Sequence, residues 1–95
     1  TAPETYMLSQ NYPNPFNPST SIEYSAPSTG TATLEIFNVT GQKVRTLFSG
    51  ELQAGVYRML WEGKDENGAN MPSGIYFSRL TCGNVVSTRR MLLLK

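Results

Sequence analysis

The chain has 95 residues, so it holds one domain with a modest core. Hydrophobic residues make up 39% and aromatic residues 11%, which excludes a disordered tail as the whole molecule. Eight Lys and Arg side chains against seven Asp and Glu give a net charge of +1, without a long run of either sign. That balance argues against general nucleic-acid affinity and against a polybasic membrane anchor.

The chain contains no histidine and one cysteine, Cys82. Zinc sites and nucleophile–base pairs usually need these residue types, so we expect no metal, no cofactor and no catalytic activity. Cys82 is predicted to be a small apolar residue near a strand end, since nothing beside it would lower its pKa. The longest apolar run, Met91–Leu94, is too short for a signal peptide or a membrane span. Because the chain begins without methionine, we expect it to be a fragment of a longer protein.

Residues 1–19 are predicted to be a proline-rich lead-in that clasps the domain, and residues 20–95 to form the domain itself. Three prolines within Asn11–Pro18 remove backbone donors, so this stretch should be extended but unpaired. The alternative is a plain linker. Tyr12 and Phe16 favour the clasp, because aromatic side chains in a linker would otherwise stay exposed to water.

From Thr20 onward, short segments of alternating apolar and polar residues are separated by turn residues. No window of eleven residues has the periodicity of an amphipathic helix. We therefore predict an all-β fold, an immunoglobulin-like antiparallel β-sandwich of six or seven short strands. The expected strands are Tyr6–Leu8, Ser21–Ser25, Ala32–Val39, Lys43–Phe48, Val56–Trp61, Gly74–Cys82 and Val85–Leu94.

Three local signals refine this prediction. Val44 and Leu47 break the alternation of their strand, which indicates a bulge or a strong twist. Ser49–Gly55 contains two glycines and is expected to be a loop, with only a brief pairing near its centre. The Gly83-Asn84 pair predicts a tight hairpin. The expected core consists of Tyr57, Met59, Trp61, Tyr76 and Leu80, faced by Leu34, Ile36 and Val44.

The acidic stretch Asp65–Asn70 has oxygen ligands at alternate positions and loosely resembles half of a calcium loop. The bidentate Glu at the twelfth position is missing, since Tyr76 stands there. A turn in which Asp and Asn side chains bind nearby backbone is the favoured interpretation, and the calcium alternative stays open. Glu62, Asp65 and Glu66 also suit an exposed acidic turn better than acid–base catalysis.

The aromatic residues Tyr57, Trp61 and Tyr76 allow a second alternative, a sugar-stacking platform on a carbohydrate-binding β-sandwich. Their alternating placement on adjoining strands favours a core position instead. Burial of Trp61 would exclude the platform.

Five short segments carry a family signal. They are LSQNYPNPFNP at Leu8–Pro18, IFNVTGQKV at Ile36–Val44, Ala54-Gly55 with Trp61, PSGIYF at Pro72–Phe77 and RMLLLK at Arg90–Lys95. Together they resemble the C-terminal sorting domains of the type IX secretion system, also called the Por secretion system. They are similar as well to the immunoglobulin-like domain of flagellar hook-capping proteins. No single segment is specific, so the resemblance depends on the ordered set.

The resemblance to sorting domains implies a transport address that directs a parent protein across the bacterial outer membrane. Such domains are cleaved or used for surface anchoring. The implied recognition residues are Gly74, Tyr76, Arg90, Met91, Leu92, Leu93, Leu94 and Lys95. The implied domain-boundary motif is Tyr12, Pro13, Asn14, Pro15 and Phe16.

The same resemblance implies the partners and the location. The partners are the type IX machinery at the outer membrane, including its sortase-like peptidase, and an N-terminal cargo domain. Neither a nucleic acid nor a small-molecule substrate is expected. The location is the periplasm in transit, and then the cell surface or the medium.

The terminal run Met91–Leu94 allows two interpretations. A last strand can be added to the sheet edge of a receptor, with main-chain hydrogen bonds for affinity. It can equally be the final core strand of this domain. All four residues are apolar, so one face of the strand needs a partner, either an inner sheet or another protein. A structural module of the hook-capping type is the main alternative function.

Overall fold

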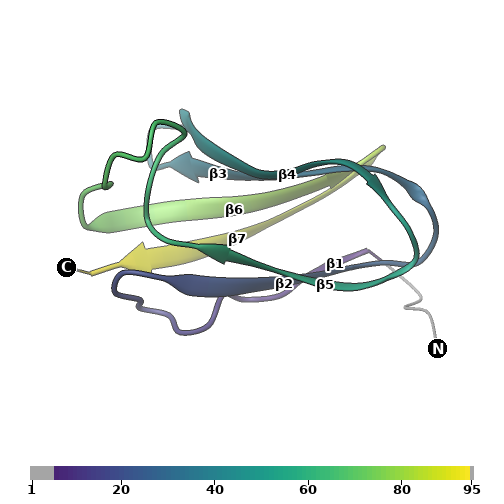
Figure 1. The fold of residues 1–95 in the computed structure, drawn as a ribbon, viewed down its shortest axis with the longest axis horizontal. Helices are drawn as coiled ribbons and strands as arrows, with labels where there is room; N and C mark the ends of the chain where they lie inside the picture. The colour runs from purple at the N-terminus through teal and green to yellow at the C-terminus, as the bar shows by residue number, and fades with distance from the viewer. Residues whose placement is uncertain (1–5, 95) are drawn as a thin grey trace.

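The computed structural model describes residues 6–94. It contains seven strands in two antiparallel sheets that lie face to face (Figure 1). The prediction of an all-β, immunoglobulin-like sandwich is therefore confirmed. The strands are β1 (Met7–Leu8), β2 (Thr20–Ala26), β3 (Gly30–Asn38), β4 (Lys43–Leu52), β5 (Gly55–Trp61), β6 (Gly74–Cys82) and β7 (Val85–Leu93). Across residues 6–94 we find no helix that could span a membrane.

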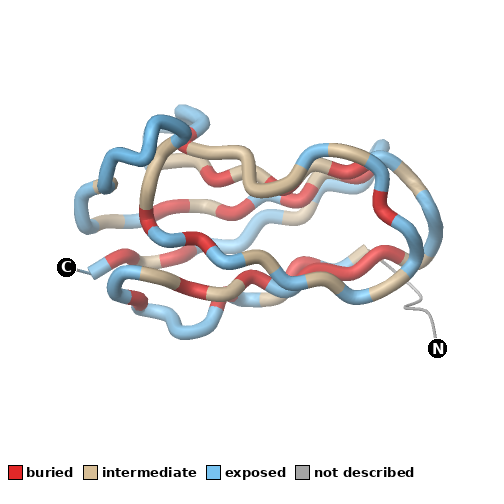
Figure 2. The backbone as a smooth tube through the Cα atoms, viewed as in Figure 1, coloured by how far each residue is buried: buried red, intermediate tan, exposed pale blue. Residues whose placement is uncertain are grey.

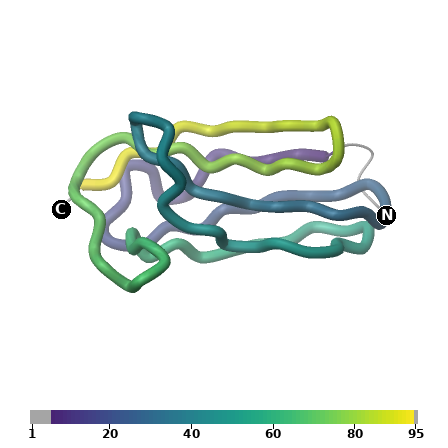
Figure 3. The backbone as a smooth tube through the Cα atoms, turned by 90° about the horizontal axis from the view of Figure 1, so that it is seen from above, coloured from purple at the N-terminus to yellow at the C-terminus, as the bar shows by residue number. Residues whose placement is uncertain are grey.

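One sheet has the strand order β1-β2-β5 and the other the order β4-β3-β6-β7. The strands run along the long axis of a molecule that measures 38 × 22 × 19 Å. Seen from above, β1 and β7 lie at one side of the sandwich and β5 at the other (Figure 3). The N-terminal strand and the C-terminal strand are therefore neighbours, although they belong to different sheets.

The core lies between the sheets because side chains alternate across each strand. In β2 and β3 the alternation predicted from the sequence holds, and Ile22, Leu34 and Ile36 are fully buried. Figure 2 shows buried and exposed positions alternating along the strands. The predicted core residues Trp61, Tyr76, Leu80, Leu34, Ile36 and Val44 are all buried.

Tyr57 and Met59 were expected at the centre of the core and are only partly buried at its margin. Both lie on β5, which is an edge strand with a single hydrogen-bonded neighbour, β2. A side chain on an edge strand is covered by a neighbouring strand on one side only. Trp61, on the same strand, is buried because Phe16 and Tyr76 pack on it, and the central assignment of the other two residues was wrong.

The irregularity predicted in the fourth strand is confirmed. Leu34 lies opposite Phe48, but the next residue of β3 lies opposite Thr46, so Leu47 has no partner. A second shift skips Val44 in the same way. The two residues that break the alternation are thus the two that the register omits.

The predicted loop at Ser49–Gly55 was wrong over most of its length. β4 continues to Leu52, whose side chain is buried, because Gly30–Thr33 of β3 pairs with this stretch. Gly50 therefore did not end the strand, whereas Gly55 begins β5. The predicted hairpin at Gly83-Asn84 is confirmed, with Cys82 opposite Val85.

Candidate functional site

Two segments that the family resemblance singles out lie side by side in the structure. Phe16 of the boundary motif pairs with Leu93 of β7 in a parallel bridge. The Phe16 N–H donates to the Leu92 carbonyl at 3.0 Å, and the Leu94 N–H donates to the Phe16 carbonyl at 3.0 Å. We call residues 11–18 the clasp. The prediction that this stretch is unpaired was wrong, because the residues between its prolines keep their N–H groups.

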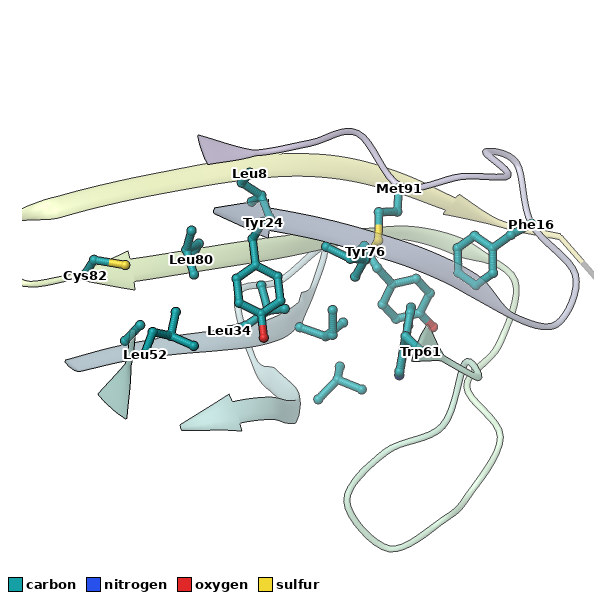
Figure 4. Close-up of a cluster of buried hydrophobic side chains, with 14 of the residues drawn as sticks. Leu8, Phe16, Tyr24, Leu34, Leu52, Trp61, Tyr76, Leu80, Cys82 and Met91 are labelled. Carbon is teal, nitrogen blue, oxygen red and sulfur yellow. The ribbon is translucent and has the colours of Figure 1, made fainter. Parts of the chain in front are cut away.

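Phe16 anchors the clasp in the core, with a side chain that is 2% exposed (Figure 4). Its ring centroid lies 5.6 Å from that of Trp61, which in turn lies 5.3 Å from that of Tyr76 at an interplanar angle of 68°. Tilted and edge-on pairs at these separations contribute about 0.5–1.5 kcal/mol each beyond area burial. The prediction that Phe16 packs on the domain is confirmed.

The close fit of the clasp depends on Gly63. Its φ is +72°, and a Cβ there would lie 3.2 Å from the Pro18 carbonyl oxygen and 3.5 Å from a methyl carbon of Leu93. Only glycine combines this backbone conformation with this approach of the clasp and the C-terminal strand.

Tyr12, the other aromatic residue of the clasp, does not pack on the domain. Its backbone exchanges two hydrogen bonds with Ser21, both 2.9 Å long. Its side chain is nevertheless 81% exposed. The expectation for Tyr12 was therefore wrong, because the pairing with β2 directs the ring to solvent.

Polar side chains that the sequence did not single out hold the clasp in shape. Asn11 is buried, and its Nδ2 donates to the Pro13 carbonyl and to Thr20 Oγ1, both at 3.0 Å. Thr20 Oγ1 donates to the same carbonyl at 2.9 Å. Gln10 Nε2 donates to Asn11 Oδ1 at 2.7 Å. Asn and Thr side chains beside a turn often bind nearby backbone groups. This preference is the sequence signal that could have identified Asn11 and Thr20.

The clasp closes the free edge of β7 over its last residues. In an edge strand, the N–H and C=O groups of every second residue point away from the sheet. In β7 and just after it, Leu92 and Leu94 are such residues, and the Leu92 carbonyl and the Leu94 N–H are bound to Phe16 as described above. The Leu92 N–H donates to Asn14 Oδ1 at 3.0 Å, and the Arg90 carbonyl accepts from Gln10 Nε2 at 2.7 Å. Between residues 6 and 94, no backbone bond from the clasp reaches β7 before Arg90, so the open part of this edge lies there. Receptor strand addition at Leu92–Leu94 would first have to displace the clasp.

Three implied recognition residues are part of the core. Tyr76 is 4% exposed, and Met91 and Leu93 are each 1% exposed. The sheet register places Tyr76 opposite Met91, and Gly74 opposite Leu93, so the structure brings these four residues together. The Tyr76 hydroxyl donates to the Pro72 carbonyl at 2.7 Å, and burial raises its pKa.

The other recognition residues lie at the surface. Arg90 and Leu94 are exposed and Leu92 is half-buried. The apolar run therefore has one pair of side chains in the core and one pair facing outward. Lys95 lies outside the described residues.

The acidic stretch forms a turn, as the favoured interpretation predicted. Asp65 Oδ1 accepts from the backbone N–H groups of Asn67 and Ala69, both at 2.9 Å. Glu66 Oε1 accepts from the Thr46 N–H at 2.9 Å. These carboxylates cap backbone donors of the loop and of β4. Within residues 6–94, no three His, Cys, Asp or Glu side chains are grouped so that they could hold a metal ion.

The sugar-stacking platform is excluded by the burial of Trp61, which is 1% exposed. The indole Nε1 donates to the Lys64 carbonyl at 2.9 Å, so its polar atom is also hydrogen-bonded inside the fold.

Cys82 is buried as well, and burial raises the pKa of its thiol. A raised pKa lowers the thiolate fraction and favours the structural interpretation of this residue.

The sequence matches a family described as the FlgD Ig-like domain over residues 17–84. The chain is 42% identical over 52 residues to the basal-body rod modification protein FlgD of Salmonella typhimurium, and to that of Salmonella typhi. The match covers 55% of this chain and 22% of the relatives, so the chain spans less than a quarter of their length.

Solved structures share the fold. Dimeric latent PorU from Porphyromonas gingivalis has a TM-score of 0.75 at 17% identity, over 99% of this chain and 10% of that one. FlgD from P. aeruginosa has a TM-score of 0.60 at 21% identity, over 78% and 58%. PorZ, an essential surface component of the type IX secretion system of P. gingivalis, has a TM-score of 0.57 at 19% identity, over 95% and 11%.

Proposed function

Because the chain belongs to the family of FlgD Ig-like domains, we propose that it is a non-catalytic structural module that binds other proteins during assembly, of the flagellar hook-capping type. The family match carries this proposal, since it includes every residue of β2 to β6. The identity to the rod modification protein FlgD supports it. The interior is filled by side chains, so the module would bind its partners through its faces and edges.

A chimera tests this proposal. The present chain replaces the immunoglobulin-like segment of Salmonella FlgD, and the chimera is expressed in a strain that lacks FlgD. Restored motility in soft agar is the expected result, and a Trp61→Ala chimera serves as the unfolded control. A chimera that is folded and present at the normal level, yet gives no motility, would contradict a hook-capping role.

A second candidate function, a type IX sorting domain, is favoured by a different observation. The resembling segments Leu8–Pro18 and Arg90–Lys95 lie almost wholly outside the family match at residues 17–84. In the structure the clasp and β7 are hydrogen-bonded to each other and share the Phe16 anchor. A family likeness in two distant segments that form one unit favours a role for that unit.

Under this second candidate, the domain directs its parent protein across the outer membrane. Its partners would be the secretion machinery, including the sortase-like peptidase, and the N-terminal cargo. The parent protein would pass through the periplasm to the cell surface or the medium. The exposed Arg90 and Leu94 would be available to a receptor while the clasp stays in place.

A secretion assay tests the second candidate. A fluorescent cargo with an N-terminal signal carries the chain at its C-terminus in a bacterium with a working type IX system. Deletion of the last residues would remove Met91 and Leu93 from the core, so surface substitutions are sharper: Arg90→Glu with Leu94→Ser. We expect surface export of the intact fusion and periplasmic retention of the variant. Retention of a folded intact fusion would contradict the sorting function.

A further inference from the structure

The outer face of the four-stranded sheet carries a row of basic and aromatic side chains. Lys43 lies opposite Phe37 in the pairing of β4 with β3. Phe37 lies opposite Phe77 on β6, and Phe77 lies opposite Arg90 on β7. Residues that are directly opposite share a face of the sheet. We call these four residues, together with Arg79, the basic face.

Arg79 is held over the aromatic part of this face. Its guanidinium carbon lies 4.4 Å from the centroid of the Phe37 ring. This cation–π contact orients the guanidinium while leaving it exposed. An oriented guanidinium loses less side-chain entropy when it binds a carboxylate in bidentate geometry.

The basic face has more positive than negative side chains. The same outer face carries two carboxylates. Glu35 lies opposite Arg79 in the pairing of β3 with β6, and its Oε2 lies 3.7 Å from Lys43 Nζ. Glu51 lies opposite Thr31 at the other end of β3. Within the described part of the chain, neither Arg79 nor Arg90 has an acidic side chain within ion-pair distance. The outer face of the other sheet differs, since its Arg58 lies 3.4 Å from Glu23.

A mostly apolar hollow of about 340 Å³ lies at one end of the basic face, where the clasp meets β6 and β7. Its lining residues are Asn14, Pro15, Ile75, Arg90, Met91 and Leu92. Ile75 and Leu92 lie opposite each other, and Ile75 is 40% exposed. The hollow therefore offers an apolar side chain a site next to an arginine.

We propose that the basic face binds an extended acidic segment of a partner protein, with an apolar side chain seated in the hollow. Same-face residues of a strand repeat every two positions, about 6.6–6.8 Å apart. Ile75, Phe77 and Arg79 follow this spacing along β6. A segment lying along β6 would place an apolar residue over Ile75, an aromatic residue over Phe77 and a carboxylate near Arg79. This inference rests on the proposed role in protein binding and names the partner's chemistry.

The probe is the peptide acetyl-Glu-Leu-Asp-Phe-Asp-Glu-amide, and its control has Gln and Asn at the acidic positions. Amide chemical shifts of the labelled 95-residue chain report the site, and fluorescence anisotropy reports the affinity. The acidic peptide is expected to shift the amides of Phe37, Phe77 and Arg90. The neutral peptide is expected to bind at least about tenfold more weakly, because charge pairs give specificity.

Two matched charge reversals separate the basic face from general electrostatics. Arg90→Glu is expected to weaken binding of the acidic peptide by about tenfold or more. Arg58→Glu makes the same change in charge on the opposite sheet and is expected to weaken it by less than about threefold, which is the effect of long-range charge alone. Both side chains are exposed, so both variants should fold.

Several outcomes would overturn the inference: equal affinity for the neutral peptide, shifts confined to the three-stranded sheet, or no shift at about 1 mM peptide. Dimerisation of the chain through the basic face, seen by sedimentation, would also overturn it. Arg90→Glu is then tested in the chimera and in the secretion fusion. Loss of function in the unchanged chain counts against the proposed functions, whereas full motility of the Arg90→Glu chimera counts against this inference alone.

Discussion

Phe16 is the residue that attaches the clasp to the sandwich. Its ring lies in the core between the sheets and contacts Trp61, while Tyr12, four positions earlier, leaves its ring in solvent. The two residues therefore offer a matched pair of aromatic truncations within one short segment.

Phe16→Ala is expected to lower the free energy of unfolding by about 3–5 kcal/mol, because it leaves a cavity beside Trp61. Tyr12→Ala is expected to change it by less than about 0.5 kcal/mol, since the lost ring is exposed. Urea denaturation followed by tryptophan fluorescence measures both. Equal effects of the two truncations would show that the clasp is not anchored by Phe16.

Ser78 is a polar residue that is buried in the sandwich. It is fully buried in β6, and its Oγ has no hydrogen-bond partner among the described residues. Ser78→Ala is therefore expected to leave the stability unchanged or to raise it by about 1 kcal/mol, because no bond is lost and the desolvation cost disappears.

Thr20 provides the control for Ser78, because its equally buried hydroxyl is bonded within the clasp. Thr20→Val keeps the shape but should cost about 1–3 kcal/mol, since it leaves buried partners unsatisfied. Thermal unfolding of the two variants makes the comparison. A clear destabilisation by Ser78→Ala would mean that its hydroxyl has a partner.

At the scale of elements, β7 is an edge strand whose last residues are covered by the clasp rather than by another strand. Covering an edge protects it from pairing with other chains. The covering is made of one backbone pairing at Phe16 and the Asn14 side chain, and the Gln10 side chain binds the edge just before them at Arg90.

Hydrogen exchange should reveal this covering. The amides of Leu92 and Leu94 are expected to exchange slowly although they face away from β6. Asn14→Ala should accelerate exchange at Leu92 while the Met91 amide, which faces β6, keeps its protection. Fast exchange at Leu92 and Leu94 in the unchanged chain would contradict the covering.

The elements that could be predicted are those determined by residues close together in the sequence. The hairpin at Gly83-Asn84 and the bulges at Val44 and Leu47 follow from a turn pair and from broken alternation. The end of β4 at Leu52 could not be predicted, because a distant pairing with β3 extends the strand through Gly50. Propensity is overridden by tertiary pairing in such cases.

The same limit applies to the candidate site. The clasp motif and the terminal strand were singled out separately, through their resemblance to a family. Their contact joins residues 78 positions apart, Asn14 and Leu92, and nothing in the local sequence indicates it. The sequence pattern also did not indicate that Phe16 is buried and Tyr12 exposed, because both aromatic side chains are suited to packing on the domain.

At the scale of the whole molecule, the buried phenols of Tyr24 and Tyr76 contribute to the pH dependence of stability on the alkaline side. Burial raises the pKa of Tyr24, with a smaller contribution from Tyr57, and burial raises the pKa of Tyr76. The thiol of Cys82 is shifted in the same direction by burial. In each case the fold favours the neutral form.

Stability is therefore expected to fall as the pH rises above about 10, the ordinary tyrosine pKa. As the pH rises, these groups lose their protons in the unfolded chain before they lose them in the folded chain. Their contribution to the free energy of unfolding is therefore complete below the unfolded pKa, and it is lost as the pH rises from the unfolded pKa through the raised, folded one. Urea denaturation between neutral and alkaline pH measures this. Tyr24→Phe with Tyr76→Phe should flatten the decline, and a decline of unchanged slope would assign it to other groups.

The parallel pairing of the clasp with β7 has a mechanical consequence. Tension applied to the two ends of the chain pulls the clasp towards its N-terminal side and β7 towards its C-terminal side, along one shared axis. The bonds at Phe16 and Asn14 are then loaded together in shear and cannot be opened one by one. Forced unfolding depends on the rate of barrier crossing rather than on equilibrium stability. A sandwich closed by a parallel pairing is therefore expected to resist tension between its two ends more strongly than one whose terminal strand has an open edge.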